Sequence, residues 1–178
     1  MSERADKINA FNERAKAEGW PTHCDLALDF QSPVLCEALA LWRERAGAHK
    51  WPSRAQMTPR LMKGFLTRVA IVDVVRMAGM VRFRTRVTGS EIERYYGSAS
   101  AGTFVDEIVP APFRERWSAG WELPLDVEGP VRTIGRLEFR NQEYLNTENF
   151  VAPLGEPGGL PDAVLQVSDF QPVPGVTW

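Results

Sequence analysis

The segment that most constrains the fold is residues 80–90, where apolar or small side chains alternate with arginines. The first set is Val81, Phe83, Thr85 and Val87, and the second is Arg82, Arg84 and Arg86. A period of two is typical of a β-strand with one buried face, because successive side chains point to opposite sides. An apolar run at residues 69–75 precedes this strand, and Met77-Ala78-Gly79 can turn the chain between them. The sequence therefore predicts an antiparallel hairpin with Phe83 in the core.

A helix signal follows this hairpin directly. Ser90-Glu91-Ile92-Glu93 has the pattern of a capping box, and Gly97 is placed to end a short helix. A hairpin followed by short helices is typical of a sensory or ligand-binding α+β module. It is not the start of a nucleotide-binding βαβ unit.

Periodicity and turn residues predict the remaining elements. Helices are expected at residues 3–18, 32–46, 59–66 and 112–124, and strands at residues 67–76, 80–88, 131–139, 144–154 and 163–170. Residues 19–31 show no clear period and are interpreted as a surface connector. We expect an N-terminal helix and connector (1–31), one domain (32–171) and a C-terminal tail (172–178). The fold class is α+β, a five-stranded antiparallel sheet with helices on one face and an extra N-terminal helical segment.

Charge and hydropathy argue against several classes of partner. The formal net charge of the 178 residues is −2, whereas nucleic-acid and anionic-membrane binding need a surplus of Lys and Arg. No stretch is apolar enough to span a bilayer, and the N-terminus lacks a hydrophobic signal region. We therefore expect a cytoplasmic protein without nucleic-acid or membrane partners, in which Cys24 and Cys36 stay reduced.

The order of these elements is that of the PAS domain, and four stretches resemble a family of small stand-alone bacterial PAS-like proteins. They are Leu41-Trp42-Arg43, Pro52-Ser53-Arg54 with Pro59 downstream, residues 86–92 running to Tyr96-Gly97, and residues 102–108. The resemblance covers about residues 35–170. It implies a PAS-like sensory fold.

The resemblance also implies where a ligand would lie. In PAS-like proteins the helix carrying Phe113, Trp117 and Trp121 covers the inner face of the sheet, where many relatives enclose a small molecule. The candidate pocket residues are Tyr95, Tyr96, Phe104, Phe113, Trp117 and Trp121. The alternative is a cavity filled by these side chains, because protein interiors are densely packed. Arg54 is either a structural clamp at the entry to the domain or a ligand contact.

Cofactor and catalytic signatures are missing from the expected places. Residues 112–124 contain no His for haem, and residues 90–125 contain no Cys for blue-light flavin chemistry. The histidines, His23 and His49, and the two cysteines lack the spacing of a zinc site. No hydrolase, metalloprotease or phosphate-loop motif is present. We expect no metal, haem or flavin and no enzymatic activity. The sequence leaves open whether a small organic ligand binds.

Three classes of function remain. The first is a single-domain PAS-like regulatory module that contacts a signalling protein in trans, with or without a small apolar ligand. The second is a small-molecule carrier or enzyme of a cone-shaped α+β fold, and the third is a nucleic-acid-binding sheet built on the arginine strand. The thin apolar stripe of the N-terminal helix predicts a homodimer that buries Ile8 and Phe11; the alternative is a helix folded back on its own sheet.

Overall fold

The computed structural model describes residues 2–138 and 145–174. The helices are α1 (Glu3–Ala17), α2 (Pro33–Ala46), η1 (Arg54–Gln56), η2 (Leu66–Arg68), α3 (Ser90–Tyr96), α4 (Val105–Ile108) and α5 (Ala111–Asp126). The strands are β1 (Thr22–Asp25), β2 (Val69–Met77), β3 (Met80–Thr88), β4 (Val131–Arg136), β5 (Leu145–Leu154) and β6 (Ala163–Pro172). The predicted strand ends at residues 139 and 144, and residues 175–178 of the predicted tail, lie outside the described residues.

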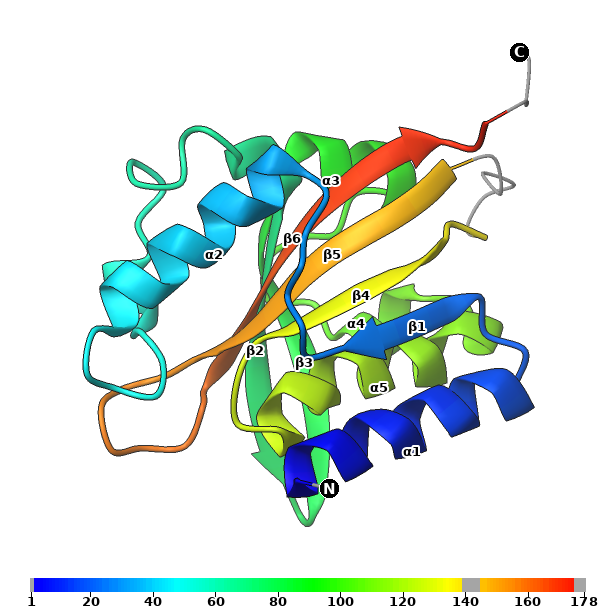
Figure 1. Ribbon diagram of the computed structural model, residues 1–178, viewed down its shortest axis with the longest axis horizontal. Coiled ribbons are helices and arrows are strands. Elements are labelled where there is room, and N and C mark those ends of the chain that lie inside the picture. Colours follow the sequence, from blue (N-terminus) through cyan, green and yellow to red (C-terminus); the bar gives the residue numbers. More distant parts are fainter. Residues whose placement is uncertain (1, 139–144, 175–178) are drawn as a thin grey trace.

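A single antiparallel sheet organises the fold, with the strand order β1-β4-β5-β6-β2-β3. The β2–β3 hairpin occupies one edge, and the chain returns through α3, α4 and α5 to a meander that ends beside β2 (Figure 1). The sequence-based prediction of an α+β fold with an antiparallel sheet is confirmed. The sheet has six strands instead of five, because part of the predicted connector pairs with β4 as β1.

Both faces of this sheet are covered, whereas the sequence analysis placed the helices on one face. α2 packs on the side to which β5 contributes Phe150, Ala152 and Leu154, which we call the α2 face. α5 packs on the side to which β5 contributes Val151, which we call the α5 face; α1 lies beside α5 (Figure 1). Successive side chains of a strand point to opposite faces of the sheet. The strands in the middle of the sheet are apolar on both sides, so both faces can pack against helices.

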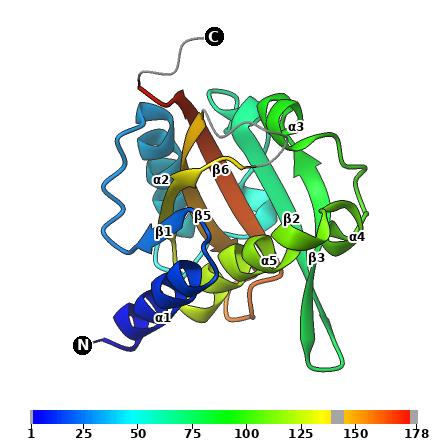
Figure 2. The ribbon, with the colours of Figure 1, turned by 90° about the vertical axis from the view of Figure 1, so that its right-hand side faces the viewer.

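The strand and helix boundaries follow the sequence closely at the hairpin. Ala78 and Gly79 form the turn with φ values of 44° and 81°, and Phe83 is 3% exposed. The hairpin extends beyond the rest of the sheet (Figure 2). Helix α3 forms as predicted, but Gly89 and not Ser90 is its N-cap, so the capping box is absent. A Cβ on Gly89 would lie 2.4 Å from the carbonyl oxygens of Leu66 and Thr67, which requires glycine there.

Two further predictions need adjustment. The helix expected at residues 59–66 is a series of turns that leads into η2. The longer helix α5 does not stop at Pro124 but continues to Asp126. Proline removes one hydrogen bond within a helix, and α5 ends only two residues after Pro124.

Candidate functional site

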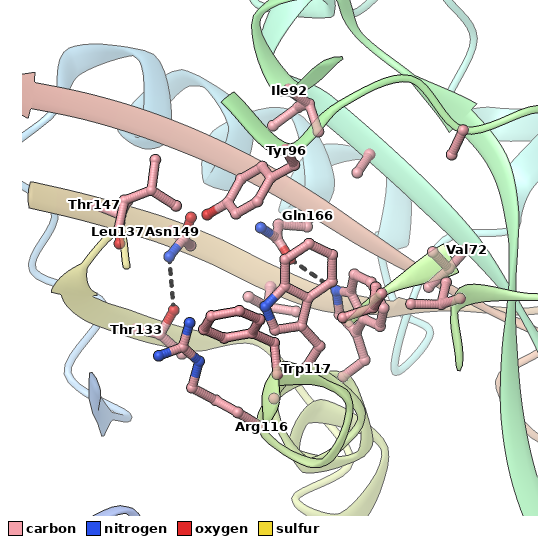
Figure 3. A pocket seen from close by; sticks show the side chains of 18 of the residues that line it. Val72, Ile92, Tyr96, Arg116, Trp117, Thr133, Leu137, Thr147, Asn149 and Gln166 are labelled. Carbon is pink, nitrogen blue, oxygen red and sulfur yellow. Dashed lines mark hydrogen bonds between the residues drawn. The ribbon is translucent and has the colours of Figure 1, made fainter. Parts of the chain in front are cut away.

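A cavity of about 500 Å³ lies between the α5 face of the sheet and the helices α3, α4 and α5. Its floor is formed by side chains of β2, β4, β5 and β6, and Phe11 of α1 lines it from the N-terminal helix. Figure 3 shows the floor residues Thr133, Asn149 and Gln166 facing Tyr96 and Trp117 across this space. The volume suits a small organic molecule, since ligand cavities in proteins begin at about 300 Å³.

Aromatic rings from α3 and α5 form one wall of the cavity. Tyr96 meets Trp117 edge to face, with ring centroids 5.0 Å apart and an interplanar angle of 90°. Trp117 and Trp121 make a second such contact at 6.0 Å, one helical turn apart. Phe113 precedes Trp117 by the same spacing and also lines the cavity. These rings offer flat apolar surfaces on the side opposite the sheet.

Polar side chains from three strands form part of the floor of the cavity, which lies opposite these rings. Nδ2 of Asn149 donates to Oγ1 of Thr133 at 3.0 Å. Nε1 of Trp121 donates to Oε1 of Gln166 at 2.7 Å, and Nε2 of Gln166 donates to Oγ of Ser168 at 2.9 Å. These bonds join α5 to the middle of the sheet and fix the two amides. The floor therefore presents amide groups of defined orientation to any ligand.

The ionisable groups among the described lining residues are Tyr96, Arg116 and Arg136. Burial raises the pKa of Tyr96 to about 12, so its phenol is neutral at physiological pH. Nη1 of Arg116 donates to a carboxylate oxygen of Glu138 at 3.2 Å, and its guanidinium lies 5.3 Å from the ring centre of Phe113. No Asp, Glu, His or Cys occurs among the described residues that line the cavity.

Four of the six predicted pocket residues line the cavity: Tyr96, Phe113, Trp117 and Trp121. The remaining two do not. Tyr95 lies on a different side of α3 from Tyr96 and packs on Phe170, with ring centroids 4.2 Å apart. Phe104 lies at the sheet edge, where it bridges to Arg84 and its ring stacks under the guanidinium of Arg82 at 3.8 Å. Adjacent residues of a helix point about 100° apart, so Tyr95 and Tyr96 cannot share one wall.

Arg54 lies outside the cavity, in a cluster of arginines around Asp73 on β2. Its Nη1 donates to Oδ1 of Asp73 at 2.8 Å, while Arg84 and Arg86 of β3 contact the same carboxylate at 3.3 and 2.9 Å. The Asp73 side chain is only 9% exposed. A buried carboxylate needs such partners. This geometry matches a structural clamp, and it places the arginine strand in ion pairs with the neighbouring strand and loop.

Ile8 and Phe11 are buried within the chain itself. They are 6% and 7% exposed and belong to the apolar cluster beneath α1, together with residues of β1 and α5. Asn12 fastens the helix further: Nδ2 donates to the carbonyl of Cys24, and the Cys24 amide donates to Oδ1, both at 2.8 Å. This arrangement is the alternative in which the helix folds back on its own sheet. The homodimer itself stays a prediction.

The sequence analysis missed the polar part of the cavity, namely Thr133, Asn149 and Gln166. A signal was present for Asn149, because Asn146, Thr147, Glu148 and Asn149 place polar side chains on both faces of a strand that is otherwise apolar. Glu148 faces the other side, where its carboxylate accepts from Arg132 at 2.7 Å and from the backbone amide of Ser32 at 3.0 Å. Which of these polar residues faced a cavity depended on the strand register.

Neither a metal site nor a membrane span occurs in the described part of the chain. No group of three or more His, Cys, Asp or Glu side chains could hold a metal ion among residues 2–138 and 145–174. His23, His49 and Cys36 are exposed, and Cys24 is buried beneath α1. Over the same residues, no helix has the length and hydropathy that crossing a membrane requires. The absence of haem and flavin stays a prediction.

Comparison with known proteins found solved structures of low similarity. No protein-family model and no curated protein matches the chain. A variant of RsLOV is 17% identical with a TM-score of 0.41, over 60% of this chain and 61% of that one. An RNA-binding light-oxygen-voltage receptor is 16% identical with a TM-score of 0.37, over 66% of this chain and 35% of that one. This chain therefore matches less than two thirds of either structure, and its function has to be argued from its own cavity.

Proposed function

We propose that this chain is a PAS-like sensory module whose cavity takes a small, mainly apolar ligand and which acts by contact with a signalling protein in trans. The observation that carries this proposal is the cavity of about 500 Å³, with aromatic rings on one side and oriented amides on the other. Mostly apolar cavities with a few convergent polar groups are the usual form of a small-molecule site. No Asp, Glu, His or Cys occurs among the described residues that line the cavity, and we therefore propose binding as its role.

The helices that cover the cavity also form part of the outer surface. Ile108 of α4 lines the cavity and is 44% exposed, and α4 is tied to the hairpin through the ion pair between Asp106 and Arg82 at 2.8 Å. A ligand that prefers one packing of α3, α4 and α5 shifts the population of the surface they present. Signal transfer to a partner protein would follow from this shift.

The first test identifies the ligand. Native mass spectrometry of protein purified from its own host should show a bound small molecule. A Cβ on Gly120 of α5 would meet no other atom within 4 Å, so Gly120→Leu should fill the cavity without displacing the fold. The Gly120→Leu protein should lose the molecule. Gly159→Leu, the same change in the exposed β5–β6 loop, should keep it.

The second test separates a sensor from a carrier. Hydrogen exchange of residues 105–126 should slow when the identified molecule is added, because the helices close on it. Binding without any change in exchange would indicate a carrier. A haem or flavin found in the first test would contradict the prediction that these cofactors are absent. If the unaltered protein and the Gly120→Leu protein give native mass spectra that both lack a bound molecule, the proposed function is contradicted.

The homodimer is also proposed, but it must use a surface other than Ile8 and Phe11 as they lie in the folded chain. Light scattering of the full chain over a range of concentrations measures its mass directly. A monomer at the highest concentration would contradict the dimer and leave the cavity proposal unaffected.

A further inference from the structure

Two arginines line the cavity, and no described lining residue carries a negative charge. Arg116 belongs to α5, and Arg136 is the last residue of β4. A guanidinium stays charged at any physiological pH. The chain as a whole has a formal net charge of −2, so these two positive charges are a local feature of the cavity. The charge of the described lining therefore favours an anionic ligand over a cationic one.

Arg116 keeps hydrogen-bond donors that the described part of the chain does not use. Its Nη1 donates to a carboxylate oxygen of Glu138 at 3.2 Å, and the described residues give its side chain no second hydrogen bond. The buried side-chain atoms without a partner are, over the same residues, Nε of Arg45 and Oδ1 of Asn149, so no unpartnered nitrogen of Arg116 is sealed inside the protein. The Arg116 side chain is 12% exposed and lines the cavity, whereas Glu138 is 41% exposed and is not among the described lining residues. The N–H groups that Glu138 leaves unused are therefore open to a ligand.

The positive charge lies at a polar end of the cavity. Figure 3 shows the Arg116 guanidinium on the same side as Thr133 and Thr147, with Val72 on the opposite side. The sheet order agrees, because Thr133 and Thr147 belong to β4 and β5, whereas Val72 belongs to β2 beyond β6. Burial raises the pKa of Tyr96, and the charge of Arg116 opposes this rise, so the guanidinium also acts on the Tyr96 phenol. The end over β2 and β3 is lined mainly by apolar side chains.

The other polar groups of the lining do not select a charge. Thr133 and Thr147 carry hydroxyls, which can both donate and accept and so serve neutral and anionic ligands alike. The amide of Gln166 accepts from Trp121 and donates to Ser168. A guanidinium only donates, carries a full charge and matches the geometry of a carboxylate. The arginines are therefore the groups of the described lining that distinguish an acid from its neutral analogue.

Resting on the function proposed above, we propose that the cavity takes a hydrophobic monocarboxylic acid, whose carboxylate contacts Arg116 and whose hydrocarbon body lies against the rings of α3 and α5. A single carboxylate suits a guanidinium that already shares its charge with Glu138. Arg136 is exposed, so water screens its charge and its contribution is smaller. The volume of about 500 Å³ has room for an acid with two fused rings.

Two matched probes test the charge. 2-Naphthoate and 2-naphthamide have the same fused rings, and the first carries a carboxylate where the second carries a neutral carboxamide. Calorimetric titration of the unaltered protein should show 2-naphthoate binding about tenfold more tightly, the size expected when a hydrogen bond gains a charge. Arg116→Gln removes the guanidinium, so this preference should disappear. Arg94→Gln removes the same charge from α3, at an exposed residue outside the described lining, and should keep the preference.

Glu138→Gln tests the same contact while Arg116 stays in place. It removes the carboxylate that competes for the guanidinium, and the exposure of Glu138 makes a loss of folding unexpected. 2-Naphthoate should bind more tightly to Glu138→Gln than to the unaltered protein, while the affinity for 2-naphthamide should not change. Thermal melting shows whether each variant folds. If Arg116→Gln does not fold, Glu138→Gln decides whether Arg116 holds the acid.

Three results would overturn the proposal. If 2-naphthamide binds the unaltered protein as tightly as 2-naphthoate or more tightly, the cavity does not select an acid, but it still binds a molecule and the proposed function stands. If the preference for 2-naphthoate survives in folded Arg116→Gln, or does not increase in Glu138→Gln, the carboxylate does not contact Arg116. If neither probe binds, this inference fails, and the native mass spectrum of the host-purified protein then decides the proposed function separately.

Discussion

The two faces of the sheet are built from the same strands but differ in what fills them. On the α2 face, Phe150, Leu154 and Leu165 are fully buried against α2 and the loop that follows it. On the α5 face, the neighbouring residues Thr147, Asn149 and Val151 border a cavity. Dense packing stabilises a fold, whereas space lined with oriented polar groups serves binding. The comparison therefore assigns stability to the α2 face, and it supports the proposal that the α5 face recognises a ligand.

The largest effect is expected for Phe150→Ala. The Phe150 ring contacts Phe30 and Trp42, with ring centroids 5.9 and 6.5 Å away, and is 0% exposed. Loss of such a ring leaves a void in a packed core and should lower the free energy of unfolding by about 3–5 kcal/mol. Urea denaturation measures this change. A loss below about 1 kcal/mol would show that the α2 face is not the stabilising core.

A matched pair of valines compares the faces directly. Val167→Ala on the α2 face and Val151→Ala on the α5 face remove the same two methylene equivalents from residues that are 0% and 3% exposed. We expect a loss of about 2 kcal/mol for Val167→Ala and about 1 kcal/mol for Val151→Ala, because the Val151 methyls already border empty space. Equal losses in urea denaturation would indicate that the cavity is packed like the opposite face.

The pH dependence tests the environment of the cavity. Burial raises the pKa of Tyr96 above the usual 10 to about 12, so the folded state holds its phenolic proton more tightly than the unfolded state. The stability that this contributes is fully present below about pH 10 and is lost as the pH rises toward 12. Tyr96→Phe should therefore lose less stability than the unaltered protein between pH 10 and 12, as measured by thermal melting. A parallel decline of both proteins would place Tyr96 in contact with water.

The smallest effect is expected at the surface of the helices beside the cavity. Arg14 of α1 and Glu115 of α5 form an ion pair, and their side chains are 44% and 64% exposed. Exposed pairs contribute about 0–1 kcal/mol, so Arg14→Gln should change the free energy of unfolding by less than about 0.5 kcal/mol at physiological salt. A larger loss in urea denaturation would mean that charge, and not the burial of Ile8 and Phe11, holds α1 on the domain.

Local patterns in the sequence determined much of the fold. The alternation around Phe83 set the faces of β3, and the spacing of Phe113, Trp117 and Trp121 identified the helix that covers the cavity. These patterns are readable because a strand repeats every two residues and a helix about every 3.6. The helix signals of α1 and α2 were equally local, since Gly47 is the C-cap of α2 and Gly19 follows the C-cap of α1, Glu18.

The tertiary structure decided the features that these periodic patterns do not encode, such as strand β1 and the ion pairs of Asp73. Residues 22–25 have no alternation of their own and become β1 only because β4 offers them backbone hydrogen bonds. In the sequence, Asp73 is only a polar residue within an apolar run. In the folded chain its carboxylate contacts Arg54, Arg84 and Arg86, which lie up to 19 residues away in the sequence.

The cavity itself was decided at the same level. Asn149 and Gln166 face it because the register of β5 and β6 turns them toward α5, and pairing between distant segments fixes that register. The sequence by itself determined which elements form and which of their sides are apolar. Only the packing of those elements determined where space was left between them, because an unfilled volume belongs to no single segment of the chain.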